Sequence, residues 1–205
     1  MEKTKRYEIL ESLPTYGPMY IPVTENNELY YSEGLVVKFF KSDGTDWVAN
    51  FKPGWTGFNA VYEFGIEDDI LVIAGGTCYL MNPEEQKPKS TFGVGYESVI
   101  KTLDGRLILQ DLTDLTVFEI NGEHWHTERI SWDGIKDLKL KGTLVSGLSF
   151  DPMNDKNRWV EFIVDLEKRN VKGGSYRQYE FKPIAANVES VRRKNGEKQP
   201  WWKIW

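Results

Sequence analysis

His124, His126 and Glu128 are the residues whose types and spacing come closest to a metal site. Alternate residues of a strand point to one face, so a strand over 124–130 would gather all three side chains. Imidazole and carboxylate groups are accepted zinc ligands. The chain has only two histidines, however, and such sites usually need a further, distant ligand. We therefore expect no metal and no cofactor, and keep these three residues as the candidate ligands.

Other side chains capable of chemistry fall at positions with simpler explanations. Cys78 is the single cysteine and lies in an apolar strand pattern, which predicts a buried small side chain rather than a nucleophile. Carboxylates pair at Asp111 and Asp114 and within residues 67–69, all at predicted turns. Hydrolysis of a sugar would require two carboxylates to converge in one cleft. The loop 151–157 offers oxygen ligands but lacks the order of a calcium-binding loop.

The tryptophans are the candidate binding residues. In repeat proteins such residues commonly pack between neighbouring sheets, and the alternative is an aromatic-lined surface for a protein or sugar partner. Five lie in or beside predicted strands: Trp47, Trp55, Trp125, Trp132 and Trp159. We take as candidate binding residues Trp47, Trp125, Trp132 and Trp159, together with Trp201, Trp202 and Trp205 near the C-terminus.

Strands must position these residues, because hydrophobic periodicity is that of strands almost everywhere. Residues 35–40, 115–120 and 159–164 are rich in β-branched and aromatic side chains and are bounded by turn residues. No stretch between Pro14 and Tyr176 keeps a helical apolar stripe for three turns. Turn signals such as Asp-Gly and Asn-Gly recur about every 40 residues, the length of a four-stranded propeller blade.

The repeat predicts four units of four short strands. They are residues 19–24, 29–32, 35–41 and 46–51; then 60–66, 70–74, 78–82 and an outer strand near 90; then 98–103, 106–111, 115–120 and 124–130; and finally 135–140, 144–150, 158–166 and 170–176. The predicted fold is all-β, a small propeller-like arrangement of four antiparallel four-stranded repeats. A β-sandwich or meander is the alternative. Residues 1–18 or 176–190 could add a fifth sheet.

Composition places the chain among ordinary globular proteins. Of 205 residues, 40% are hydrophobic and 28% are charged, which excludes a disordered chain. The net charge of −5 argues against a nucleic-acid-binding protein, because little would neutralise phosphates. We read residues 1–188 as one all-β domain and 189–205 as a basic, tryptophan-rich tail. No run is long and apolar enough for a signal peptide or a membrane span, so we expect a cytoplasmic protein.

A pattern in the last third of the domain resembles one found in uncharacterised bacterial proteins. It comprises Ile-Ser-Trp-Asp-Gly-Ile-Lys-Asp-Leu-Lys-Leu at 130–140, Gly-Leu-Ser-Phe-Asp-Pro-Met at 147–153, Trp-Val-Glu-Phe at 159–162 and Gly-Gly-Ser-Tyr at 173–176. That family has no assigned activity. The resemblance implies a bacterial cytoplasmic protein and identifies no site residue.

These observations favour a non-enzymatic protein-binding module of a bacterial cytoplasm. An acidic surface would attract a basic partner, such as a toxin whose active site recognises nucleic acid. The alternatives are a carboxylate-dependent hydrolase acting on a sugar or ester, and a carbohydrate-binding propeller. If the blades do not close into a ring, their free edges favour a homodimer.

Overall fold

The computed structural model describes residues 5–16, 19–63, 69–153 and 157–179. Within these residues, strands form four sheets of four strands each. Sheet A contains β1 (Tyr7–Leu10), β2 (Ile21–Val23), β3 (Leu35–Phe40) and β4 (Asp46–Phe51), and sheet B contains β5 (Ala60–Glu63), β6 (Ile70–Ala74), β7 (Thr77–Met81) and β8 (Pro88–Phe92). Sheet C contains β9 (Ser98–Lys101), β10 (Leu107–Gln110), β11 (Leu115–Phe118) and β12 (His124–His126), and sheet D contains β13 (Ile135–Lys141), β14 (Leu144–Asp151), β15 (Arg158–Asp165) and β16 (Asn170–Gly173).

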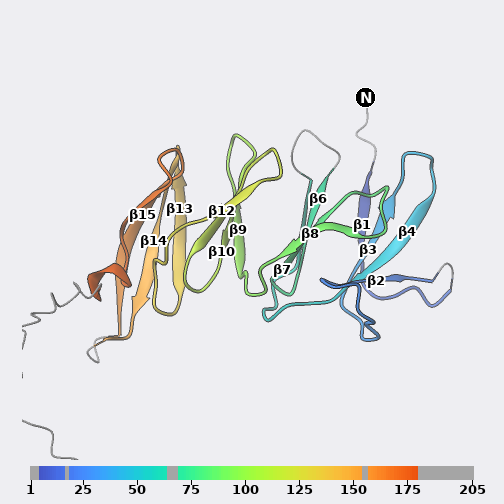
Figure 1. The fold of residues 1–205 in the computed structure, drawn as a ribbon, viewed down its shortest axis with the longest axis horizontal. Coiled ribbons are helices and arrows are strands. Elements are labelled where there is room, and N and C mark those ends of the chain that lie inside the picture. The colour runs from blue at the N-terminus through green and yellow to red at the C-terminus, as the bar shows by residue number, and fades with distance from the viewer. Residues whose placement is uncertain (1–4, 17–18, 64–68, 154–156, 180–205) are drawn as a thin grey trace, which may run out of the picture.

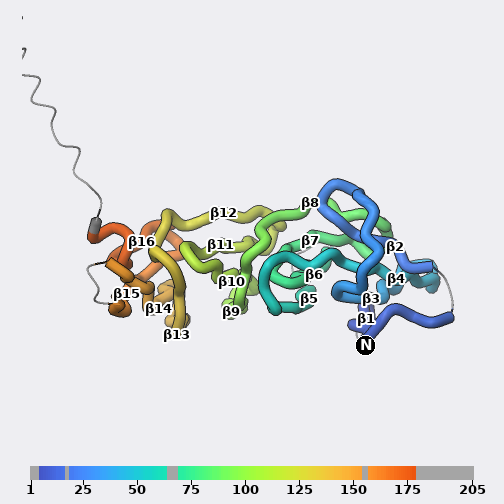
Figure 2. The backbone as a smooth tube through the Cα atoms, turned by 90° about the horizontal axis from the view of Figure 1, so that it is seen from below, coloured from blue at the N-terminus to red at the C-terminus, as the bar shows by residue number. Residues whose placement is uncertain are grey.

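The four sheets follow one another along the long axis of the molecule, in chain order. Figure 1 shows sheet A at the N-terminal end of this row and sheet D at the opposite end. Figure 2 shows the same row from below, with the two end sheets again far apart. The predicted propeller-like arrangement of four four-stranded units is confirmed. The described sheets form an open row rather than a closed ring.

Alternation along the strands explains why the sheets stack. In β6, Ile70, Val72 and Ala74 join the core shared with sheet A, whereas Leu71 and Ile73 join the core shared with sheet C. Successive side chains of a strand point to opposite faces, so a strand between two sheets must be apolar at every position. The run Ile-Leu-Val-Ile-Ala of β6 is such a sequence, and all five residues are buried.

Sheet D has the pattern of a sheet with one covered face. Along β14, residues alternate between buried and more exposed positions from Leu144 to Asp151. The buried side chains, including Val145, Phe162 and Val164, pack against sheet C. The alternate side chains lie on the outer face at the end of the row.

Sheet A differs from the prediction in two strands. Residues 29–32 form no strand, and β1 pairs with β3 in their place. In addition, β2 pairs with β4 in parallel, with Ile21 opposite Ala49, so the sheet is not wholly antiparallel. The buried Asn50 side chain accepts a hydrogen bond from Gly34 N (2.9 Å) and donates one to Ser32 O (2.9 Å). This amide satisfies backbone groups that a strand ladder would otherwise satisfy.

Strands of sheets B, C and D lie where the sequence predicted them, with shorter ends in several cases. They pair as simple antiparallel meanders. Within residues 1–18, β1 joins sheet A rather than a fifth sheet, and most of 176–190 lies outside the described residues. Among the described residues, the only complete helical element is the short 3₁₀ turn η2 (Arg177–Tyr179). No helix within the described ranges has the length and hydrophobicity needed to cross a membrane.

Candidate functional site

His124 lies in an aromatic stack rather than among ligands. Its ring packs on Phe92 with centroids 4.4 Å apart and runs nearly parallel to Phe118 at 5.9 Å. Burial, and then the charge of His126, lowers the pKa of His124. A neutral imidazole stacked on two phenyl rings fits this environment, because burial disfavours the charged form.

His126 and Glu128 turn to different partners. The Nδ1 atom of His126 lies 2.9 Å from Thr116 Oγ1 and 3.8 Å from Asp114 Oδ1. Glu128 follows the end of β12 and forms an ion pair with Arg177. Among the residues that the structure describes, no group of three or more potential ligands is gathered for a metal ion.

Tyr96 and Cys78 carry a hydroxyl and a thiol that could act as nucleophiles, and both residues are buried. Tyr96 OH lies 2.8 Å from Thr116 Oγ1 in the core between sheets B and C. Burial raises the pKa of Tyr96 well above its usual value, and burial likewise raises the pKa of the Cys78 thiol. The sequence predicted the burial of Cys78, and the structure confirms it. These groups have the environment of core residues rather than of reactive ones.

Carboxylates singled out from the sequence have structural partners. Asp111 and Asp114 belong to the turn between β10 and β11, where Asp111 N donates to Asp114 O at 3.1 Å. Burial raises the pKa of Asp114, and the charge of His126 opposes that effect. Asp69 forms an ion pair with Lys89 at 2.7 Å. Residues 67 and 68, and part of the 151–157 loop, lie outside the described residues.

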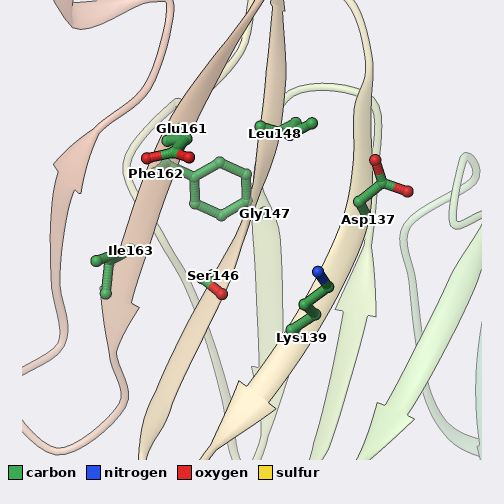
Figure 3. Close-up of a pocket in the computed structure, with 8 residues that line it drawn as sticks. All are labelled: Asp137, Lys139, Ser146, Gly147, Leu148, Glu161, Phe162 and Ile163. Atoms are coloured by element: carbon green, nitrogen blue, oxygen red, sulfur yellow. The ribbon is translucent and has the colours of Figure 1, made fainter.

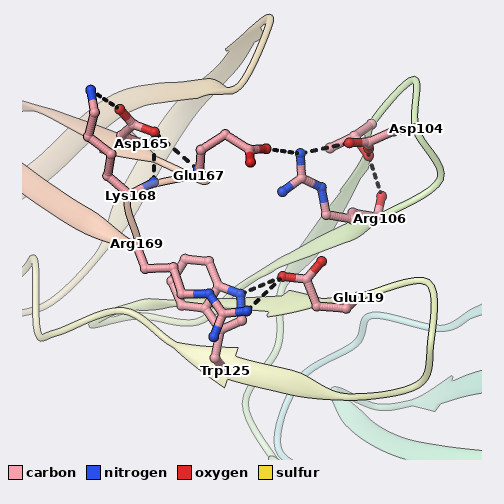
Figure 4. Close-up of polar contacts among 9 residues, drawn as sticks. Asp104, Arg106, Glu119, Trp125, Asp165, Glu167, Lys168 and Arg169 are labelled. Atoms are coloured by element: carbon pink, nitrogen blue, oxygen red, sulfur yellow. Dashed lines mark hydrogen bonds and ion pairs between the residues drawn. The ribbon is translucent and has the colours of Figure 1, made fainter.

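Two candidate tryptophans pack between sheets. Trp47 is 4% exposed, and its Nε1 donates to Pro83 O at 2.8 Å. Trp125 is half-buried; its Nε1 donates to Glu119 Oε1 at 2.8 Å, and the Arg169 guanidinium lies over its ring. Figure 4 shows this contact beside a network that joins the turns of sheets C and D. Both rings therefore contribute to packing between sheets.

The network in Figure 4 is centred on Arg106, which directly precedes β10. Its Nη2 donates to Asp104 Oδ2 at 2.7 Å and to Glu167 Oε1 at 3.1 Å. Asp104 belongs to sheet C and Glu167 to the β15–β16 turn of sheet D. One guanidinium thus connects two neighbouring sheets at one edge of the row.

Trp159 lies on the surface of sheet D, whereas Trp132 is half-buried in the connection between β12 and β13. Trp132 packs on Tyr176 with ring centroids 4.7 Å apart. Trp159 is 39% exposed, with Lys136 Nζ 3.9 Å from its ring centroid and Phe150 packed beside it. A sugar stacking on Trp159 would have to displace Lys136. Trp201, Trp202 and Trp205 lie outside the described residues.

A hollow of about 370 Å³ opens on sheet D, near Trp159. Figure 3 shows the residues that line it: Asp137, Lys139, Ser146, Gly147, Leu148, Glu161, Phe162 and Ile163. It lies where the pairing of β13 with β14 is interrupted by a bulge, and Asp137 there has a φ of 55°. Its two carboxylates come from β13 and β15, and β14 lies between these strands. The hollow combines an apolar floor with both signs of charge.

Trp55 is the exposed tryptophan that sequence reasoning left out of the candidate set. It lies in the connection between β4 and β5, which crosses from sheet A to sheet B (Figure 1). Its side chain is 85% exposed. The sequence signal was its setting in Pro-Gly-Trp-Thr-Gly at 53–57, which places a large apolar residue between two glycines in a predicted connection.

The backbone around Trp55 is held firmly although the ring is exposed. Trp55 N donates to Val94 O at 2.8 Å, and the flanking amides of Gly54 and Thr56 donate to Ala74 O and Gly75 O at 3.0 and 2.9 Å. A Cβ atom at Gly54 would lie 2.5 Å from Val94 O. This close approach of the connection to sheet B requires glycine. The indole is therefore presented to solvent from a backbone that hydrogen bonds hold in place.

A small hollow beside Trp55 carries carboxylates. It has a volume of about 150 Å³ and is lined by Glu25, Glu28, Lys52, Pro53, Gly54, Trp55, Thr77, Tyr79 and Val94, which we call the Trp55 pocket. Lys52 forms an ion pair with Glu28, and Tyr79 OH donates to Lys52 O at 2.7 Å. Burial, followed by the charge of Glu25, raises the pKa of Tyr79 to about 12.

Charge is distributed unevenly along the row. Residues 1–134, which form sheets A to C, contain 22 acidic and 11 basic side chains, a net charge of −11. Residues 135–205 contain nine acidic and 15 basic side chains, a net charge of +6, which accounts for the total of −5. The Trp55 pocket therefore belongs to the acidic part of the molecule.

No protein-family model matches the chain, and a search of curated proteins found no match. The resemblance of the C-terminal pattern to uncharacterised bacterial proteins accordingly stays a prediction. Function has to be inferred from the surfaces of the molecule itself.

Proposed function

We propose that this chain is a non-enzymatic protein-binding module that recognises a basic protein. The observation that carries the proposal is the exposed indole of Trp55 on a backbone fixed by sheet B. Tryptophan is the residue most often found as an energetic anchor of protein interfaces. The backbone that carries the ring is already held in place by hydrogen bonds, so binding does not have to order this segment and more of the contact energy contributes to affinity.

The acidic character of sheets A to C supports a basic partner. A net charge of −11 over residues 1–134 attracts positively charged proteins over several ångströms and speeds their association. A toxin that acts on nucleic acid in a bacterial cytoplasm has the required positive surface. Neutralisation of such a toxin is the function that we propose for this module.

The alternative of a carboxylate-dependent hydrolase has weaker support. Asp111 and Asp114 belong to a turn, and Asp69 is paired with Lys89. Asp137 and Glu161 line the hollow on sheet D from strands separated by β14. Hydrolysis of a glycosidic bond generally needs two carboxyl groups placed on either side of that bond. The contacts of these side chains favour turn and surface roles.

Affinity capture tests the proposed function. The immobilised chain is compared with Trp55→Ala and with Leu103→Ala, which removes an exposed side chain from sheet C. We expect the wild type and Leu103→Ala to retain a basic protein from a bacterial lysate, and Trp55→Ala to lose it. For the purified partner, Trp55→Ala should raise Kd about tenfold or more. Equal binding by all three chains, or retention of acidic proteins alone, would refute the proposal.

A further inference from the structure

We infer that the Trp55 pocket receives an arginine side chain of the partner, with the guanidinium against the indole and beside Glu25. This inference rests on the proposed function and names the chemical group that the site recognises. It requires a pocket of the right size, an available carboxylate and an accessible aromatic ring. The described residues supply all three.

The size of the pocket favours a single side chain over a small-molecule substrate. Pockets for drug-sized ligands and cofactors occupy about 300–1,000 Å³. The Trp55 pocket has a volume of about 150 Å³. A side chain projecting from a protein partner therefore fits better than a free cofactor.

The charges of the pocket favour a cation. Glu28 is already paired with Lys52. Glu25 also lines the pocket, and within the described residues it forms no ion pair. Since Lys52 offsets one of the two carboxylates, the lining keeps a net negative charge. An incoming cation can pair with Glu25 without displacing Lys52.

The neighbouring indole favours arginine over lysine. A guanidinium is planar, stacks on aromatic faces and donates two parallel hydrogen bonds to a carboxylate. An ammonium is more strongly hydrated, so its transfer to an aromatic surface costs more. Trp55 and Glu25 together offer a flat π surface next to an acceptor, which is the combination that a guanidinium uses best.

The hydrogen bonds of the connection make the pocket available before binding. Trp55 N is bonded to Val94 O, and both Val94 and Thr77 line the pocket. Tyr79 also lines the pocket, and its hydroxyl donates to Lys52 O at 2.7 Å. Hydrogen bonds therefore connect the backbone of Trp55 and of Lys52 to other residues that line the pocket. A preformed site of this kind binds with little rearrangement.

Nuclear magnetic resonance of the full chain tests the inference. The indole N–H signal of Trp55 is assigned with Trp55→Phe and followed during titration with acetyl-arginine-amide. Acetyl-citrulline-amide, which has the same shape without the charge, and acetyl-lysine-amide are the comparison ligands. Glu25→Gln removes the proposed partner, and Glu161→Gln removes a carboxylate on sheet D as the matched control.

We expect a saturable shift of the Trp55 signal with the arginine compound, a weaker response to lysine and none to citrulline. Glu25→Gln should weaken arginine binding several-fold, and Glu161→Gln should leave it unchanged. Equal responses to arginine and citrulline, or binding unaffected by Glu25→Gln, would overturn the inference. If these tests fail while Trp55→Ala still abolishes capture of a basic protein, the proposed function stands without the arginine site.

Discussion

Trp47 and Trp55 show how two residues of one type acquire opposite roles within a short stretch of chain. Trp47 lies on the face of β4 that packs against sheet B, so its ring is enclosed and its Nε1 bonds to Pro83 O. Trp55 lies beyond the end of that strand, where the connection follows the surface. Residue type suggested binding for Trp47, and its position in the sheet instead gives it a packing role.

A substitution at Trp47 separates these roles. Trp47→Phe removes the donor to Pro83 O (2.8 Å) and leaves a buried carbonyl without this partner. We expect a loss of about 1–3 kcal/mol in the free energy of unfolding, measured by urea denaturation. Binding of the basic partner by the folded variant should match the wild type. A large loss of affinity at unchanged stability would instead place Trp47 in the interface.

Asp104 should make the stability of the folded protein depend on pH in a defined direction. Hydrogen bonds from Arg106 and then Thr102 lower its pKa to about 2, below the usual value of 3.8. A lowered carboxyl pKa stabilises the folded state above the unfolded pKa, and this contribution is lost as pH falls toward the folded pKa. Wild type should therefore melt above Asp104→Asn at neutral pH, with the difference in Tm disappearing between about pH 4 and pH 2.

The control for Asp104 is Glu161, an exposed carboxylate on β15. Glu161→Gln should show no comparable change in its Tm difference over the same acidic range. A constant gap between wild type and Asp104→Asn down to pH 2 would contradict the role given to Arg106. Because Asp104 is largely exposed, we expect the difference to be small and to decrease with added salt.

At the scale of elements, hairpins were predictable and long-range pairings were not. The turns at Asp104-Gly105 and Asn121-Gly122 have glycines at φ of 95° and 86°, so the local sequence marks them directly. The parallel pairing of β2 with β4 has no such signal, because the chain between them passes through β3. Local patterns therefore predicted sheets B to D and missed the composition of sheet A.

The candidate site was less predictable than the fold for a related reason. The five consecutive apolar residues of β6 predict, from sequence alone, that both faces of this strand are buried. Exposure of Trp55 depends on Gly54 approaching Val94 O, a contact between distant parts of the chain. The same limit applies to the histidines, since only the folded structure places Phe92 against His124. The spacing of the two histidines alone could not distinguish an aromatic stack from a set of metal ligands.

The side chain of Asn50 bonds to the backbone of residues 32–34, next to the predicted strand that sheet A lacks. Asn50→Ala removes one acceptor for Gly34 N and one donor to Ser32 O, both from a fully buried side chain. Losing these two part-buried hydrogen bonds, at about 0.5–1.5 kcal/mol each, should lower the free energy of unfolding by about 1–3 kcal/mol, measured by chemical denaturation. The exposed Asn170 of β16 is the matched control, and Asn170→Ala should change stability by under about 0.5 kcal/mol. Equal effects would show that Asn50 does not hold residues 32–34.

At the scale of the whole molecule, local stability should differ from sheet to sheet, because the four sheets form an open row. Sheets B and C each pack on two neighbouring sheets, whereas sheet D packs on sheet C alone. Rows of stacked units gain stability from contacts between nearest neighbours, and they open from their ends. The homodimer expected for blades that do not close stays a prediction. Sedimentation would test it, and the exposed outer face of sheet D is a surface through which two copies could associate.

Hydrogen exchange should reveal this gradient. We expect the amides of β6 and β10 to exchange most slowly and those of β16, at the edge of sheet D, to exchange early. Ile108→Ala, which removes a fully buried side chain from the core between sheets C and D, should cost about 2–5 kcal/mol. Because that core holds sheet D in place, exchange should accelerate more in β14 and β15 than in β3. The exposed Ile163→Ala should have little effect, and uniform acceleration by Ile108→Ala would show that the row unfolds as a single cooperative unit.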